Sequence, residues 1–155
     1  MSDAIHLTAD HLSRLNLAPA HAALAQLLAQ PTLEQPALCF NIEFPQDPTD
    51  PRELSEIPEV RLWFIRLDSH YPWLPLYLDW EAGELARYTA MLVPHQFSPV
   101  DGIRYNPEAL EIYVMAKVFS VHHWLRVNDL DGLNRLKQMT QMLGYELDDG
   151  LFGLL

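Results

Sequence analysis

The sequence predicts an α+β protein, with a small sheet of about four strands covered by helices and the C-terminal third helical. Alternating apolar residues, typical of half-buried strands, gather in the first half of the chain. Apolar residues spaced three and four apart, typical of helices, dominate after residue 106. Strands early and helices late favour the α+β class. The 155 residues, 49% of them apolar, fit a single domain, 1–155.

The N-terminal segments predict two strands with a helix between them. Ile5 and Leu7 indicate a short opening strand. Pro19 begins a helix with one apolar stripe, and Pro31 ends it. Residues 38–44 alternate between apolar and polar, which predicts a half-buried strand.

The middle of the chain predicts a loop, two further strands and a helix. Residues 46–58 combine prolines with acidic residues, which predicts a loop with one helical turn after Pro51. Residues 60–67 are apolar on both faces apart from Arg61 and Arg66, and they predict a central strand. Residues 74–80 alternate again and predict a strand at the sheet edge, and residues 82–91 predict a helix.

The C-terminal third predicts two helices. Residues 95–106 predict mostly loop, with a strand near 103–105. A long helix is expected over 107–125, because Asn and Pro stand at its start and one apolar stripe runs along it. A second helix is expected over 133–143, with Gly144 just beyond its end.

Charge and composition exclude several classes of function. The net charge of −11, from 21 acidic and 10 basic residues, should repel nucleic acid and anionic lipid. A basic protein partner fits better, or the acidity serves solubility alone. No segment reaches the roughly 18–20 apolar residues of a membrane span. The single cysteine, Cys39, and the lack of a secretory signal predict a cytoplasmic location.

Signatures of catalysis and cofactor binding are missing from the sequence. It has no Gly-rich phosphate loop, no dinucleotide fingerprint and no nucleophile elbow. Cys39 alone cannot supply the thiolates of a zinc or iron–sulfur site. We therefore expect no cofactor and a protein that binds another protein rather than an enzyme.

Two alternatives remain open. The first is a small enzyme that uses a loop histidine, His70 or His95, as one half of an acid–base pair. Its carboxylate partner would be Asp79 or Glu84. The second is a hard-cation site on the acidic residues of 47–56, although this loop lacks the alternation and central glycine of a calcium loop.

Two segments are candidates for contact with a partner. Residues 70–75 join rigid prolines to Tyr71 and Trp73, side chains that often anchor protein interfaces. The alternative is that these two aromatics cap the core from one end. The tail, 146–155, mixes acidic and apolar residues, and we expect it to dock on the chain's own sheet.

An ordered series of segments makes the chain similar to a known family. The segments are 47–68 (DPTDPRELSEIPEVRLWFIRLD), 71–75 (YPWLP), 79–80 (DW), 83–88 (GELARY), 91–95 (MLVPH), 105–111 (YNPEALE) and 141–145 (QMLGY). Together they resemble the chlororespiratory reduction family, specifically its sixth-named member. The resemblance covers most of the chain from about Phe40 onward, and the first 35 residues match loosely.

The resemblance implies an assembly factor for the photosynthetic NAD(P)H dehydrogenase-like complex 1, found in cyanobacteria and chloroplasts. It implies that the client is the ferredoxin-like iron–sulfur subunit of the hydrophilic arm. No plastid transit peptide is apparent, so it implies the cyanobacterial form, working in the cytoplasm near the thylakoid surface. It assigns no roles to residues, so the candidate partner-binding residues are chosen by their chemistry: Asp50, Arg52, Glu53, Glu56, Tyr71, Trp73, Arg87 and His95.

Overall fold

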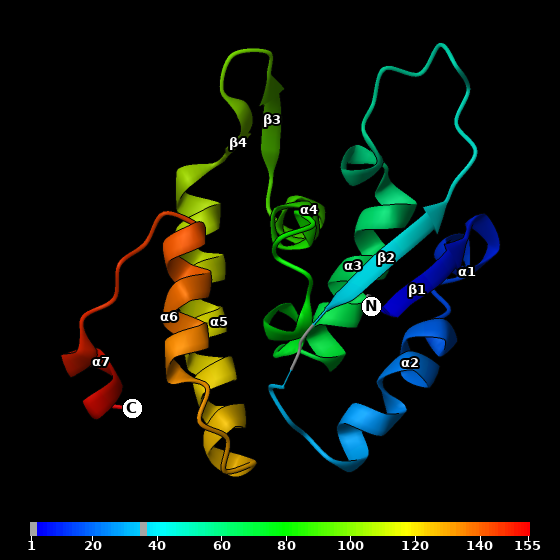
Figure 1. Ribbon diagram of the computed structural model, residues 1–155. Coiled ribbons are helices and arrows are strands. Elements are labelled where there is room, and N and C mark those ends of the chain that lie inside the picture. Colours follow the sequence, from blue (N-terminus) through cyan, green and yellow to red (C-terminus); the bar gives the residue numbers. More distant parts are fainter. Residues whose placement is uncertain (1–2, 35–36) are drawn as a thin grey trace.

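A parallel pair of strands opens the computed structural model, which describes residues 3–34 and 37–155 (Figure 1). β1 (Asp3–Thr8) pairs with β2 (Leu38–Glu43) along their whole length. Apolar residues of both strands, including Phe40, are buried in the core. Both strands predicted for this part of the chain are therefore confirmed.

Two helices connect these strands, because parallel strands need a crossover. α1 (Ala9–Ser13) starts directly after β1, and its N-terminus is capped by Thr8, whose Oγ1 accepts a hydrogen bond from His11 N at 3.3 Å. α2 (Ala18–Ala29) follows and buries Leu24. The helix predicted between the two prolines is thus confirmed.

The segment predicted as a central strand is instead a helix, α3 (Pro58–His70), so that prediction is wrong. Pro58 stands in the first turn, where a missing N–H costs nothing. The buried residues follow helical spacing: Val60, Trp63, Phe64 and Leu67. The segment looked apolar on both faces because Leu62 and Ile65 are hydrophobic yet exposed, at 54% and 45%.

The predicted edge strand over 74–80 is also wrong. Its first half is a 3₁₀ helix, η2 (Leu74–Tyr77), and all four of its side chains are buried. Alternation of apolar and polar residues indicates a strand where one face is buried and the other is exposed. Here the side chains are buried on all sides, so the alternation did not identify the element. Within residues 3–34 and 37–155, the expected pairing is reduced to an isolated parallel bridge between Leu38 and Leu78.

The free edge of β2 is covered by groups other than a strand. Asp79 N donates to the Leu38 carbonyl at 2.9 Å. Side chains of α4 (Glu84–Leu92) hydrogen-bond to the same edge at Phe40. The N-terminal sheet therefore stops at two strands instead of growing to the predicted four.

A second two-stranded sheet is an antiparallel hairpin of β3 (His95–Ser98) and β4 (Gly102–Tyr105). The strand predicted near 103–105 is confirmed, and its partner was predicted as loop. Gly102 turns the chain with a φ of +72°, in the left-handed region. Tyr105 O–H donates to the Ala86 carbonyl at 3.1 Å and ties the hairpin to α4.

The two C-terminal helices form as predicted, and the α+β class is confirmed. α5 (Pro107–Val127) is capped by Asn106, whose Oδ1 accepts from Ala109 N at 3.0 Å. α6 (Leu133–Met142) packs beside α5, and Gly144 follows it with a φ of +94°. None of the helices in 3–34 and 37–155 has both the length and the apolar character needed to cross a bilayer.

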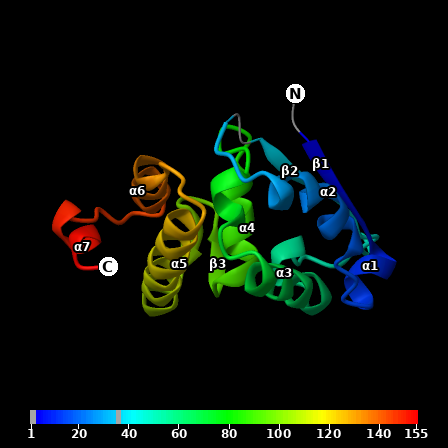
Figure 2. The same ribbon diagram turned by 90° about the horizontal axis from the view of Figure 1, so that it is seen from below.

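The tail does not dock on the sheet, so that prediction is wrong. α7 (Asp149–Gly153) lies beside α5 and α6, on the side away from β1 and β2 (Figure 2). The ring of Phe152 is 5.6 Å from that of His122 on α5. Arg126 Nη1 donates to the Leu155 carbonyl at 2.8 Å. The tail thus covers helix surface, because the sheet is already enclosed by other elements.

Aromatic stacking joins the C-terminal helices to the rest of the chain. The rings of Trp73, before η2, and Trp124, on α5, stack with centroids 4.8 Å apart and planes at 15°. The Arg135 guanidinium of α6 lies 3.3 Å from the centre of the Trp80 ring. These contacts bring segments far apart in sequence into one core.

Candidate functional site

A groove opens between the acidic loop, α4 and the β3–β4 hairpin. We call it the α4 groove, and its volume is about 340 Å³. One side is the end of the loop, with Glu53 and η1 (Leu54–Glu56). Met91 of α4 lies in its floor, and Phe97 and Ile103 of the hairpin form the opposite wall. An apolar trough with few charged groups is suited to bind an apolar side chain of a partner.

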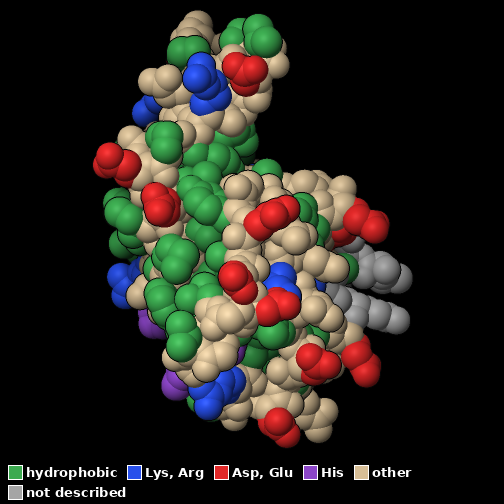
Figure 3. Space-filling view, turned by 90° about the vertical axis from the view of Figure 1, so that its left-hand side faces the viewer, with side chains coloured by type: hydrophobic (Ala, Val, Ile, Leu, Met, Phe, Trp, Pro, Cys, Tyr) green, Lys and Arg blue, Asp and Glu red, His purple; other side chains and the backbone are tan. Residues whose placement is uncertain are grey.

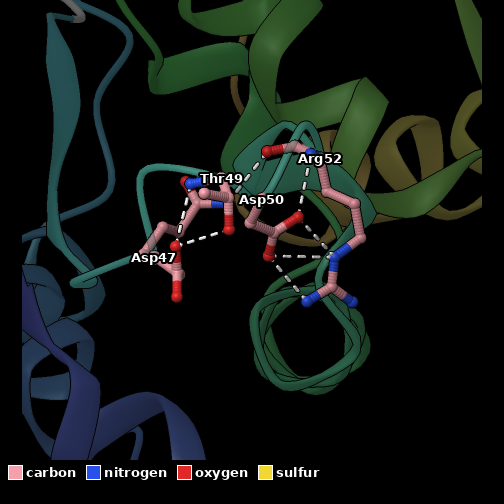
Figure 4. A network of polar contacts seen from close by, with 5 residues as sticks. Asp47, Thr49, Asp50 and Arg52 are labelled. Atoms are coloured by element: carbon pink, nitrogen blue, oxygen red, sulfur yellow. Dashed lines mark hydrogen bonds and ion pairs between the residues drawn. The ribbon is translucent and has the colours of Figure 1, made fainter.

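The acidic loop holds its shape through its own hydrogen bonds (Figure 4). Asp47 Oδ1 accepts from Thr49 N at 2.8 Å and from Thr49 Oγ1 at 2.6 Å. The Asp50 carboxylate accepts from Arg52 N at 3.0 Å and from Arg52 Nη2 at 2.9 Å. Gln46 Nε2 donates to the Arg52 carbonyl at 2.9 Å. The helical turn predicted after Pro51 is confirmed as η1.

These bonds favour the ionised forms of Asp47 and Asp50. Hydrogen bonds from Thr49 lower the pKa of Asp47 below the ordinary 3.8. Those from Arg52 lower the pKa of Asp50, and Asp50 in turn raises the pKa of Arg52. The folded-state pKa values of the acids are depressed, so their contribution to loop stability is present above pH 3.8 and is lost as the pH falls below it.

An ion pair on α4 positions Arg87 at the wall of the groove. The buried Glu84 accepts from Phe40 N through Oε2 at 3.0 Å and from Arg87 Nη1 through Oε1 at 3.2 Å. Arg87 Nη1 also donates to the Phe40 carbonyl at 2.8 Å. The pair satisfies both backbone groups of Phe40 and leaves the Arg87 side chain 37% exposed. Its guanidinium retains donors for a partner.

A buried serine and a histidine connect the loop to the hairpin. Ser55 Oγ and His95 Nε2 are 3.0 Å apart, and His95 Nδ1 is 2.8 Å from the Val93 carbonyl. Since a carbonyl only accepts, Nδ1 carries a proton, and in the neutral ring Nε2 accepts from the serine. A serine–histidine pair has the makings of a nucleophile and its base, but Ser55 is only 5% exposed. Its evident effect is to hold η1 against the start of β3.

The acid–base alternative paired a loop histidine with Asp79 or Glu84. His95 is instead bonded to Ser55 and Val93, and Glu84 to Phe40 and Arg87. His70 is exposed beside the ring of His21, with centroids 6.0 Å apart. Within the described ranges, no three His, Cys, Asp or Glu residues are grouped to hold a metal ion.

The α4 groove brings together part of the predicted partner-binding set. Glu53 and Arg87 line it, and His95 adjoins it through Ser55. Asp50, Arg52 and Glu56 are neighbours of Glu53 in the loop and in η1, but they do not line the groove.

Tyr71 and Trp73 lie elsewhere, and their burial agrees with the alternative in which these two aromatics cap the core. They are 8% and 4% exposed, respectively. The Tyr71 hydroxyl contacts Nδ1 of His21 on α2, and Trp73 stacks on Trp124. Both aromatics cap the core, because the turn into η2 faces α5 and not solvent. They offer little area to a partner.

Sequence reasoning missed the hairpin wall of the groove. Phe97 is 42% exposed, and Ile103 faces it across the register of β3 and β4. A signal was present: Asp101-Gly102 is a preferred hairpin turn, and the residues on either side alternate in polarity.

A buried ion pair between α3 and α5 was also missed. Lys117 is 4% exposed, contacts the Asp68 carboxylate and donates to the Pro72 carbonyl at 2.9 Å. Tyr88 O–H donates to the same carboxylate at 2.8 Å. Burial raises the pKa of Asp68 and lowers the pKa of Lys117. The available signal was a lysine on the inward stripe of α5, beside Val118.

The comparisons with known proteins concern nearly the whole chain. A family model described as chlororespiratory reduction 6 matches residues 7–154. The match includes the acidic loop, α4 and the hairpin, and therefore every residue that lines the α4 groove. No solved structure matches the chain significantly.

Proposed function

The chain belongs to the chlororespiratory reduction 6 family, and we propose that it holds the ferredoxin-like iron–sulfur subunit of the photosynthetic NAD(P)H dehydrogenase-like complex 1 during assembly. The family is involved in chlororespiratory reduction and in assembly of this complex, and it is named for that role rather than for catalysis. To this family role the proposal adds three points: the identity of the client, its release by this chain before the complex is finished, and a cytoplasmic location for their binding.

The α4 groove is the observation that carries the proposal. Its floor is apolar, and Phe97 on its wall stays 42% exposed in the free chain. Apolar surface rimmed by charged residues marks sites of protein contact. Aromatic anchors at the centre of such a site supply most of the binding free energy.

The charges at the groove select the client segment. Glu53 is exposed at one side and Arg87 at another, so an apolar side chain between a basic and an acidic residue would complement both. The net charge of −11 attracts basic regions of a client and speeds encounter. The loop keeps its own hydrogen bonds, so little ordering is needed on binding.

The proposed role leaves cluster chemistry to the client. Cys39 is the one cysteine of the chain, and a cluster needs several thiolates. The chain would therefore shield or orient the iron–sulfur subunit while the cysteines of that subunit bind the cluster.

The test is the affinity of the purified chain for the purified iron–sulfur subunit, with and without its clusters, by calorimetry at fixed salt. We expect Phe97→Ala and Glu53→Lys each to weaken binding about tenfold or more, as for residues that anchor an interface. Val100→Ala is the matched control, because Val100 is 90% exposed at the hairpin tip and does not line the groove.

Each outcome separates the parts of the proposal. Weakening by the groove variants and not by the control supports both client and groove. If all variants bind the subunit equally, the client is supported but the α4 groove is not the binding site. If the wild-type chain does not bind the subunit, the proposed client is wrong. The next experiment is then a screen for small molecules that bind at the Ser55–His95 pair.

A further inference from the structure

α5 has a second apolar face, opposite the one that it buries. The inward stripe is Val114, Lys117, Val118, Val121 and Leu125. On the other side, Ile112 is 71% exposed and Phe119 is 49% exposed. Ala116, between them, is exposed as well. These three positions are spaced four and three apart, so they lie along one line of the helix.

The outer face of α5 carries more apolar surface than is usual for a surface helix, although the exposed His123 lies on it four residues after Phe119. Surface helices carry polar residues opposite the core, and a helix that is apolar all round is normally covered on all sides. Figure 3 views the side of the C-terminal helices and shows a band of hydrophobic side chains running down the view, with histidines at its lower end. Among the described residues, Ile112 and Phe119 are therefore only partly covered.

Charges of opposite sign stand at the two ends of the same face. Glu108 is exposed in the first turn of α5, and Arg126 is exposed in the last. About five helical turns, or ~27 Å, separate them, so both project on the same side of the helix. The acidic residue near the N-terminus and the basic residue near the C-terminus also suit the helix dipole.

We propose that the outer face of α5 pairs with α5 of a second copy of this chain, antiparallel and about a two-fold axis near Ala116. A two-fold axis there brings Glu108 of each copy opposite Arg126 of the other. The small side chain of Ala116 lets the backbones approach and receives the Phe119 ring of the other copy. The face is thus complementary to itself in charge and shape, as an isologous interface requires.

Antiparallel pairing follows from the charge pattern. In a parallel pair, Glu108 would face Glu108 and Arg126 would face Arg126, with the two helix dipoles aligned side by side. In the antiparallel pair, opposite charges face each other and the two helix dipoles run in opposite directions. This inference does not rest on the proposed function, because the α4 groove lies on α4 and the hairpin and leaves the outer face of α5 free.

The first test measures mass in solution by sedimentation or light scattering over about 1–100 μM. We expect a dimer that dissociates on dilution, and Phe119→Glu should weaken its Kd at least tenfold. Leu62→Glu is the matched control, since Leu62 is 54% exposed on α3 and away from this face. A wild-type chain that stays monomeric throughout overturns the proposal.

The second test exchanges the charges. Arg126→Glu alone and Glu108→Arg alone place like charges opposite each other and should each weaken the dimer. The double variant restores opposite charges across the interface and should recover most of the affinity. Arg126 also donates to the Leu155 carbonyl, and the double variant lacks that bond too. The double variant is therefore compared with Arg126→Glu alone, which lacks the same bond. Tighter pairing in the double variant supports pairing across copies, and affinity no higher than in Arg126→Glu rules out the antiparallel arrangement.

Discussion

At the scale of single residues, two tyrosines differ in what their buried hydroxyl groups contact. Tyr88 O–H donates to Asp68 Oδ1 at 2.8 Å. The Tyr77 hydroxyl is buried with no hydrogen-bond partner among the described residues. A bond to a charged acceptor stabilises by about 1.5–3 kcal/mol, whereas a buried unpaired group costs about 1–3 kcal/mol.

These two positions predict opposite effects of the same substitution. Tyr77→Phe should leave the free energy of unfolding unchanged or raise it by about 1 kcal/mol, because it removes an unpaired hydroxyl. Tyr88→Phe should lower it by about 2 kcal/mol, because Asp68 loses a donor. Urea denaturation measures the free energy of unfolding of both variants. Each variant loses one hydroxyl oxygen, so each serves as the control for the other. Equal losses in the two variants would contradict the assignment.

The Tyr77 variant has a second readout in its pH dependence. Burial raises the pKa of Tyr77 from 10.0 to about 12. The raised pKa means that the neutral tyrosine favours the folded state fully below pH 10, and this contribution is lost as the pH rises toward 12. Tyr77→Phe should therefore lose less stability than the wild type over this pH range.

At the scale of elements, Arg135 links α6 to η2 and to the residues just after it. Arg135 Nε donates to the Leu76 carbonyl at 3.1 Å and Nη2 to the Leu78 carbonyl at 3.4 Å, while the guanidinium covers the Trp80 ring. Burial lowers the pKa of Arg135, yet a guanidinium stays charged near neutral pH. The planar group both stacks and donates in two directions, which an ammonium group does not do.

Arg135→Lys should lower the free energy of unfolding by about 1–2 kcal/mol although it keeps the charge. Thermal or urea denaturation measures the change. The matched control is Arg104→Lys on the exposed side of the hairpin, which should change stability by less than about 0.5 kcal/mol. If the two variants behave alike, the stacking on Trp80 contributes nothing.

At the scale of the whole molecule, Lys117 and Asp68 join the helical C-terminal part to α3. Lys117 is buried, and the Asp68 side chain is 20% exposed. Removing one member of a buried pair leaves a charge without its partner, whereas removing both avoids that cost. The pair therefore couples the two parts of the fold.

Lys117→Met should lower the free energy of unfolding by about 3 kcal/mol, and Asp68→Asn with Lys117→Met should cost less than the single change. Far-ultraviolet dichroism and tryptophan fluorescence should give one coincident transition in the wild type. Separate transitions in the wild type would show that the two parts unfold independently.

Local sequence patterns determined the elements that bury a single stripe or face. β1 and β2 alternate, and α5 repeats at helical spacing between Asn106 and Val127, so their types follow from the sequence. The acidic loop and its helical turn follow from the prolines of 46–58. For the site, the sequence indicated Glu53, Arg87 and His95 as binding residues without showing where they lie; their roles stay a prediction.

Only the tertiary structure decided what the doubly apolar segments do. Residues 60–67 are largely apolar on both faces, so periodicity cannot separate a helix from a strand, and packing placed them in α3. Residues 74–80 alternate in the sequence, but residues 74–77 are buried on all sides and form η2. The same packing buried Trp73 and brought Glu53 and Phe97, far apart in sequence, to one groove. Composition and spacing report local geometry, whereas burial and proximity depend on contacts between distant segments.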